Sequence, residues 1–253
     1  MTFIVVPLPH NLIIIDIYFC VSHVAAVPAS SDNFAYISSG TWSLVGLEND
    51  HAILSDAALA ANATNEGGVY GTWRFLKNIM GLWILQQCRA TWAAHGETHS
   101  YAELVGLAEG VSAEFPPFNP DDPRFLPPGD HPMLIQTFYA EMGHPTPQTK
   151  GEIVRCVLNS LAHTYRDVIA QLAQLSEKRV DVLHIVGGGS QNKLLNQLTA
   201  NATRIPVITG PIEATVIGNA LVQLITLGEI ADLHEGRQLV ADSFPQTRYE
   251  PQH

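Results

Sequence analysis

Three consecutive glycines stand between an apolar run and a helical pattern in the second half of the chain. Gly187, Gly188 and Gly189 follow the apolar residues 182–186, and Ser190 stands where we expect a helix N-cap. Glycine lets the backbone approach a ligand closely, and a helix start offers unpaired N–H groups to an anion. The pattern alone fits a nucleotide site and an ordinary β–turn–α connection equally well.

Small hydroxyl residues and glycine also occupy the tip of a predicted hairpin, residues 35–47. The tip reads Ser38-Ser39-Gly40-Thr41 and joins two apolar runs. Hydroxyl groups and free backbone N–H groups at such a tip can hold phosphate oxygens. An ordinary Ser/Gly turn is the commoner explanation when nothing else is known.

Two amides belong to one predicted helix that runs from Trp73 to about Ala94. Apolar residues recur along it at helical spacing, and Asn78 and Gln86 lie two turns apart on roughly the same side. Two amides so placed can face a ligand together. Exposed amides on a helix surface are the ordinary alternative.

The elements that must position these residues alternate between strand and helix. Thr149 and Glu152 form a capping-box pattern that opens a long amphipathic helix ending near residue 175. A short strand at Val207 and Ile208 precedes another helix, which opens near Glu213, and the tail after Gly228 has the polar pattern of a surface segment. This succession favours an α/β layered domain.

A proline-rich segment interrupts this alternation. Residues 115–132 contain seven prolines, which lack the N–H that helices and strands need. We expect a long ordered loop, either folded over a cleft or, the commoner case, simply covering the core.

Composition excludes several classes of function. The 253 residues carry 13 basic and 24 acidic side chains, a net charge of −11, and no basic stripe that would bind nucleic acid. No apolar run reaches the roughly 18 residues of a membrane span. The atypical segment 1–20 has no basic residue before its first apolar run, which argues against a secretory signal. We therefore predict a cytoplasmic protein that binds neither nucleic acid nor membrane.

The three cysteines and the histidine pair His95 and His99 are assigned no catalytic or metal-binding role. Cys20, Cys88 and Cys156 are odd in number, far apart and set in apolar sequence, so we expect free thiols in a reducing compartment. A buried strand is expected over residues 12–21. His95 and His99 have metal-ligand spacing but flank a glycine in a predicted loop, and no metal site is assigned.

Four long motifs, in order, carry a family resemblance. They read SSGTWSLVGLE at 38–48, NEGGVYGTWRFLKNIMGLWILQQCR at 65–89, HIVGGGSQNKLLNQLTANAT at 184–203 and GPIEATVIGNALVQL at 210–224. Together they closely resemble the rhamnulokinase branch of the FGGY carbohydrate kinases. The resemblance covers residues 21–253 and implies the C-terminal, nucleotide-binding domain of that family. The implied fold is an actin-like, ribonuclease-H-like α/β domain with a mixed sheet flanked by helices.

The resemblance also implies roles for the residues singled out above. Thr41 matches a phosphate-contacting threonine of the family, and Gln86 matches a glutamine of its ATP site. Gly188 matches an adenine-nucleotide contact, while Gly187 and Gly189 shape the turn around it.

Two further residues match the sugar site of the family. Asn78 matches a sugar-contacting asparagine, and His23 matches a histidine that opens a His-Asp-Thr-Ala-Ser-type run. The aspartate of that run is the family's general base, and here the residues after His23 read Val24-Ala25-Ala26-Val27, so no catalytic residue is assigned. The family's first domain, with its acidic phosphate and magnesium motif, is also missing from the match.

Two functions follow from these matches and departures. The first is a kinase polypeptide that, with a separate first domain, transfers the γ-phosphate of ATP with Mg²⁺ to the 1-hydroxyl of L-rhamnulose. The second is a truncated half that binds adenine nucleotide without catalysis, because loss of a general base alone costs about 10²–10⁴-fold in rate. The face left bare by a missing domain would favour self-association. Dinucleotide binding fails because Asn192 stands where the third glycine of that motif belongs.

Overall fold

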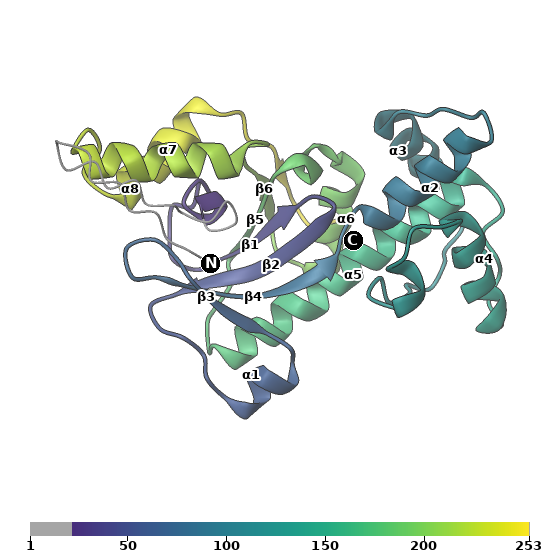
Figure 1. Cartoon of the computed structure of the whole chain (residues 1–253), viewed down its shortest axis with the longest axis horizontal. Helices are drawn as coiled ribbons and strands as arrows, with labels where there is room; N and C mark the ends of the chain where they lie inside the picture. The colour runs from purple at the N-terminus through teal and green to yellow at the C-terminus, as the bar shows by residue number, and fades with distance from the viewer. Residues whose placement is uncertain (1–21, 253) are drawn as a thin grey trace.

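The computed structural model describes residues 22–252, in which seven strands form one mixed sheet (Figure 1). Their order across the sheet is β3-β4-β2-β1-β5-β6-β7. The strands are β1 (Phe34–Ser39), β2 (Trp42–Asn49), β3 (Thr64–Gly67), β4 (Trp73–Met80), β5 (Val182–Val186), β6 (Val207–Thr209) and β7 (Arg248–Tyr249). The strands β1, β5 and β6 are parallel, and the other pairings are antiparallel. The hairpin predicted at 35–47 is confirmed as β1 and β2.

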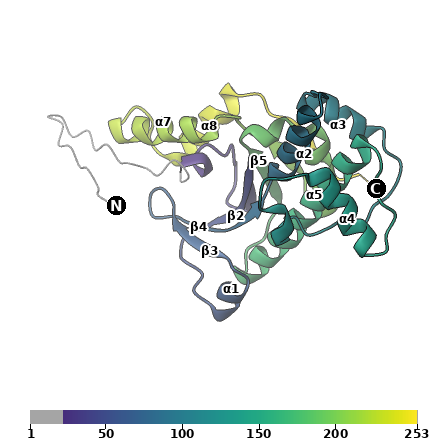
Figure 2. The same cartoon turned by 45° about the vertical axis from the view of Figure 1, so that its right-hand side comes forward.

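Helices cover both faces of this sheet (Figures 1 and 2). One face carries α5 (Lys150–Leu175) and α6 (Lys193–Thr203). The other face carries the short 3-10 helix η1 (Ser22–Val24), α7 (Ala214–Leu227) and α8 (Leu233–Ser243). The arrangement confirms the predicted mixed sheet flanked by helices.

The long helix α5 begins at the predicted capping box. The Thr149 side chain accepts from the Glu152 backbone N–H, and the Glu152 carboxylate accepts from the Thr149 N–H at 2.8 Å. Its apolar stripe is buried against the sheet, and the shared core includes Val45, Leu47, Phe75, Ile79, Val157, Leu158, Leu161, Tyr165 and Ile169. Burial of this stripe, rather than helix propensity, supplies most of the helix's stability.

The single helix predicted from Trp73 to about Ala94 is wrong. The chain forms β4 up to Met80, turns at Gly81, and only then forms α2 (Trp83–Ala94). In β4 the adjacent apolar pairs Phe75–Leu76 and Ile79–Met80 recur at helical spacing, and pairing with β2 overrides that pattern. Asn78 therefore lies on a strand and Gln86 on a helix, so the two amides do not share a helix face.

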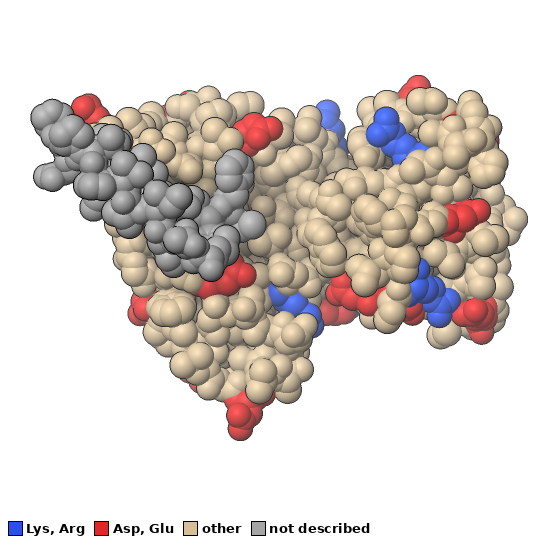
Figure 3. Space-filling model, viewed as in Figure 1, with Lys and Arg blue, Asp and Glu red and all other residues tan. Residues whose placement is uncertain are grey.

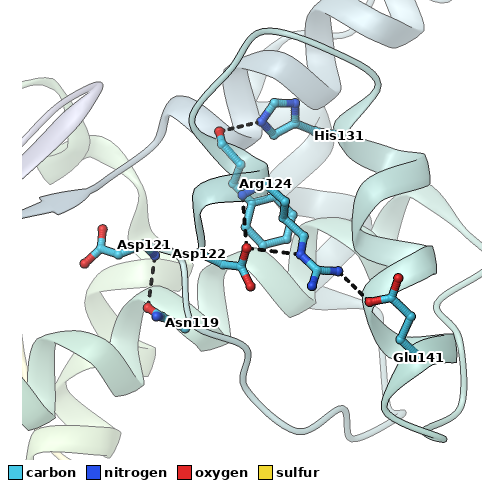
Figure 4. Close-up of polar contacts among 7 residues, drawn as sticks. Asn119, Asp121, Asp122, Arg124, His131 and Glu141 are labelled. Carbon is cyan, nitrogen blue, oxygen red and sulfur yellow. Dashed lines mark hydrogen bonds and ion pairs between the residues drawn. The ribbon is translucent and has the colours of Figure 1, made fainter.

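A helical lobe stands beside the sheet (Figure 2). It contains α2, α3 (Tyr101–Glu109) and α4 (His131–Glu141), together with the 3-10 helix η2 (Pro123–Phe125) in the proline-rich loop. The short α1 (Asp56–Ala60) lies at the other end of the sheet. In the proline-rich loop, the Arg124 guanidinium donates to the Asp122 carboxylate at 3.1 Å and to the Glu141 carboxylate of α4 at 2.8 Å (Figure 4).

The proline-rich loop covers the core, as predicted. Phe115, Phe118 and Phe125 are all buried, and the His131 Nε2 atom lies 2.9 Å from the Phe125 carbonyl oxygen. The loop also reaches the sheet, because the Met80 N–H donates to the Asp121 carboxylate at 2.7 Å. Aromatic burial and this hydrogen bond order the segment, in which η2 is a single short 3-10 turn.

The predicted surface tail after Gly228 is only partly correct. It forms α8, and its last strand, β7, pairs with β6. Arg237 of α8 is buried and pairs with Glu48 of β2 at 2.7 Å, which explains why a polar segment packs against the domain. A paired charge of this kind can be buried, whereas an unpaired one cannot.

The remaining structural predictions have mixed outcomes. Cys88 and Cys156 are free and buried, and burial raises the pKa of both thiols. Cys20 and the strand predicted at 12–21 lie outside the described residues. None of the helices within residues 22–252 combines the length and the apolar character needed to cross a membrane.

Candidate functional site

A cavity of 740 Å³ lies where the sheet meets the helical lobe, a volume typical of small-molecule sites. Four separate segments form its wall: the β1–β2 tip, the start of α2, one side of α3 along its whole length, and the glycine turn leading into α6. The lining residues are Gly40, Thr41, Leu82, Leu85, Gln86, Tyr101, Ala102, Val105, Gly106, Glu109, Gly188, Gly189, Gln191, Asn192 and Lys193. Tertiary structure therefore brings together Thr41, Gln86 and the glycine turn.

Backbone hydrogen bonds attach the hairpin tip to the start of α2. The N–H groups of Gly81 and Trp83 both donate to the Thr41 carbonyl at 3.1 Å, and the Leu82 N–H donates to the Gly40 carbonyl at 3.0 Å. The Gln86 side-chain amide then donates to the Thr41 hydroxyl at 3.1 Å. Two residues 45 positions apart thus meet at the cavity wall with their polar groups exposed to a ligand.

The three glycines differ in whether the surrounding structure leaves room for a side chain. A Cβ at Gly187 would lie 2.8 Å from the Ser39 carbonyl oxygen, and its φ of +85° favours glycine. A Cβ at Gly189 would lie 2.0 Å from the Ser39 hydroxyl oxygen, whereas one at Gly188 would meet nothing within 4 Å. Gly187 and Gly189 therefore permit close packing against the hairpin, and Gly188 is exposed at the cavity.

The helix after the glycines begins later than predicted. Ser190 is buried inside a 3-10 turn, η3 (Gly188–Gln191), and the N-cap of α6 is Asn192. The Asn192 carboxamide oxygen accepts from the Leu195 N–H at 3.0 Å. Ser190 instead receives a hydrogen bond at its carbonyl from Asn196, so the predicted Ser190 cap is wrong. Asn192 and Lys193, at the N-terminus of α6, still line the cavity. A helix N-terminus favours an anion there.

A buried hydrogen bond supports the hairpin tip from below. The hydroxyls of Ser43 on β2 and Tyr165 on α5 lie 2.7 Å apart, and both side chains are fully buried. Burial raises the pKa of Tyr165 to about 12, so its hydroxyl stays protonated. The sequence patterns contained no signal for this pair.

The α3 wall was also missed from the sequence. Ser100 and Glu103 form a complete capping box at its start, and Tyr101, Ala102 and Val105 follow along the cavity. The S-x-x-E pattern at Ser100 was a usable helix signal.

The two residues predicted at the sugar site do not line this cavity. His23 is buried in η1, with its ring centroid 5.6 Å from that of Tyr36. Asn78 is exposed on β4 opposite Leu44 of β2. Strand alternation places Asn78 and Tyr36 on the same sheet face, away from α5, so both predicted residues lie on that face.

The cavity wall carries few charges. Lys193 and Glu109 are its charged residues, and the rest is backbone, amide, hydroxyl or apolar. Within residues 22–252 no group of three or more His, Cys, Asp or Glu side chains is placed to hold a metal ion. On the face shown in Figure 3, Lys and Arg lie in separate small groups.

A second cavity, of 700 Å³, lies on the α5 side of the sheet, between β4, α5 and the proline-rich loop. Its charged or titratable lining residues are Lys77, Asp121, His163, Arg166 and Asp167. None of the residues predicted to bind ligand lines it.

Comparison with known proteins defines the class. The C-terminal domain model of the FGGY family of carbohydrate kinases matches residues 35–227. The chain therefore belongs to the FGGY family of carbohydrate kinases. It is 49% identical over 231 residues to a rhamnulokinase of Bacteroides thetaiotaomicron, a match that covers 91% of this chain and 47% of that protein. The chain thus spans about half the length of the curated relatives it matches.

Solved structures support the fold. A xylulose kinase from Rhodospirillum rubrum superposes with a TM-score of 0.68 at 15% identity, covering 92% of this chain and 45% of that one. A glycerol kinase from Plasmodium falciparum, solved with ADP, superposes with a TM-score of 0.62 at 12% identity, covering 92% and 45%. The mixed sheet flanked by helices is therefore the actin-like fold of these sugar kinases.

Proposed function

We propose that residues 21–253 form the nucleotide-binding domain of a cytoplasmic rhamnulokinase-type enzyme, which transfers the γ-phosphate of ATP to the 1-hydroxyl of L-rhamnulose. The observation that carries this proposal is the meeting of Thr41, Gln86 and the glycine turn in one 740 Å³ cavity. Likeness to rhamnulokinases over 91% of the chain supports the sugar.

The lining fits the parts of a nucleotide. Thr41, the exposed Gly188 backbone and the α6 N-terminus offer hydroxyl and N–H donors to phosphate oxygens. The α2 and α3 walls are mainly apolar and suit a base. A single carboxylate, Glu109, does not make a magnesium site, so these residues are assigned no metal ligand and no step through Mg²⁺.

The chemistry assigned to these residues is binding and orientation of the nucleotide. Donors held at the hairpin tip and at the glycine turn place the phosphates at the mouth of the cavity, which is the positioning that phosphoryl transfer requires. His23 and Asn78 are proposed to contact the sugar from the face that they share. No residue is assigned as general base.

Titration calorimetry with ATP and ADP tests the binding proposal. We expect saturable binding to the chain, and Thr41→Val should weaken ATP binding by about tenfold, because a hydrogen bond to a charged group is lost. Thr41→Ser keeps the hydroxyl and is the matched control. Absence of saturable heat with either nucleotide would contradict the proposal.

A coupled assay of ADP release with L-rhamnulose and Mg-ATP tests the reaction. Turnover by the purified chain would show that the described domain carries enough of the site for catalysis. ATP binding without turnover would leave the nucleotide-binding half-site. Addition of a first domain from a rhamnulokinase should then give ADP release at a rate about 10²–10⁴-fold below that of an intact rhamnulokinase, because this chain lacks the aspartate that acts as general base. Failure of that mixture to turn over would contradict the rhamnulokinase assignment.

A further inference from the structure

A smaller groove of 450 Å³ continues the candidate nucleotide cavity along the outer side of α2. It is lined by Gln86, Arg89, Ala90, Ala93, Thr98 and Tyr101. Gln86 and Tyr101 line the cavity and the groove alike, so the two spaces meet at these side chains. Tyr101 is 42% exposed and lies at this junction.

Arg89 holds the Tyr101 ring in place. The guanidinium carbon of Arg89 lies 4.8 Å from the centroid of the ring, and the Arg89 Nε donates to the His99 carbonyl at 2.7 Å. The backbone at the ring is fixed as well, because Tyr101 is the first residue of α3, directly after the Ser100 cap. A cation packed on one side of an aromatic ring, with its own hydrogen bond, restrains that ring.

The chemistry of the walls places a base next to this ring. Polar donors gather at the hairpin tip and the glycine turn, whereas Leu82, Leu85, Ala102 and Val105 make the side of the cavity formed by α2 and α3 apolar. Phosphates require the donors, and a planar base gains most from the apolar side and an aromatic neighbour. The base of a bound nucleotide would therefore lie on the Tyr101 side of the cavity.

We propose that Tyr101 is a specificity-determining residue of the nucleotide site. Its ring is the wall that limits the size of the base, and its removal opens the cavity into the groove along α2. This inference rests on the proposed function, because it takes a nucleotide as the occupant of the cavity. The groove would then accept an aromatic substituent carried on the base.

Calorimetry on the full chain with three probes tests this wall: ATP, N6-benzyl-ATP and an ATP carrying a benzyl substituent at C8. We expect the chain and its Tyr101→Phe variant to bind ATP and to bind both enlarged nucleotides at least about tenfold more weakly. Tyr101→Ala should bind at least one enlarged nucleotide about tenfold more tightly than the unmodified chain does. Tyr101→Ser, which also removes the ring, is a second variant in case the alanine variant does not fold.

The outcomes separate this inference from the function on which it rests. If the chain binds ATP but neither Tyr101→Ala nor Tyr101→Ser binds an enlarged nucleotide more tightly than the unmodified chain does, the role of Tyr101 as a wall is refuted and the nucleotide site stands. Equal binding of ATP and both enlarged nucleotides by the unmodified chain would also refute it. If the chain binds none of the three probes, the nucleotide site and the wall fall together.

Discussion

Two cavities of similar volume, 740 and 700 Å³, lie on different sides of this domain and have walls of different chemistry. The first is bounded by glycines, apolar side chains and backbone donors from four separate segments. The second has more charged side chains, and some of them pair within the protein: Arg166 donates to Asp167 at 2.7 Å, and Asp121 accepts from the Met80 N–H at 2.7 Å. Volume therefore does not distinguish the two cavities, whereas the chemistry of their walls does.

The largest expected effect comes from the glycine turn. Gly189→Ala places a Cβ 2.6 Å from the Ser39 Cβ, so the turn or the hairpin must shift. We expect a loss of about 3 kcal/mol in the free energy of unfolding and loss of ATP binding. Urea unfolding and calorimetry measure the two effects.

Gly188→Ala is the matched control, because its Cβ meets no atom within 4 Å. It should leave stability within about 0.5 kcal/mol of the parent and weaken only the binding of ATP. Equal destabilisation by both variants would show that hairpin packing does not distinguish the two glycines.

Acid should destabilise the sheet that carries the nucleotide cavity. Burial, together with the nearby Arg237, lowers the pKa of His184 on β5 from 6.5 to about 4. Between pH 6.5 and 4 the unfolded chain binds a proton that the folded chain does not, so stability falls as pH falls across this window. The expected contribution of this one residue is up to about 3 kcal/mol.

Urea unfolding at a series of pH values measures this loss, and His184→Gln, which does not titrate, is the comparison. The variant should show a shallower decline between pH 6.5 and 4 than the parent. Parallel declines would mean that other groups account for the acid sensitivity.

The hydrogen bond below the hairpin tip should have a smaller effect. Tyr165→Phe leaves the buried Ser43 hydroxyl without its 2.7 Å partner, and we expect a loss of about 1–2 kcal/mol. Ser43→Ala with Tyr165→Phe removes both polar atoms and should be less destabilised than the sum of the single variants. Additive single effects, measured by urea unfolding, would argue against a direct interaction.

The smallest effect is expected in the second cavity. Lys77→Ala should leave the affinity for ATP unchanged within about twofold, because Lys77 faces α5 rather than the nucleotide cavity. Lys193→Ala, at the start of α6, is the matched removal of a lysine and should weaken ATP binding. A greater loss from Lys77→Ala than from Lys193→Ala, seen by calorimetry, would reverse the assignment of the two cavities.

Local patterns in the sequence were sufficient for several elements. The hairpin at 35–47, the strand at 182–186, the capping box at Thr149 and the helix after Glu213 all formed as predicted. Each depends on interactions between near neighbours: side-chain alternation in a strand, a cap reaching three residues, or a glycine turn. Family motifs then selected Thr41, Gln86 and the glycines, although their shared location was not visible in the spacing.

Long-range packing decided what the sequence left ambiguous. Residues 73–80 became a strand because they pair with β2, and Asn192 rather than Ser190 caps α6 because Ser190 is buried inside the 3-10 turn η3. Tyr101 reached the cavity through α3, an element that was not predicted. The sequence alone determined the hairpin, the capped helix α5, the β5 strand, the helix after Glu213 and the family, because these depend on patterns among residues near one another in the chain. Only the tertiary structure decided which side chains share a cavity, because that depends on burial and pairing between residues far apart in the chain.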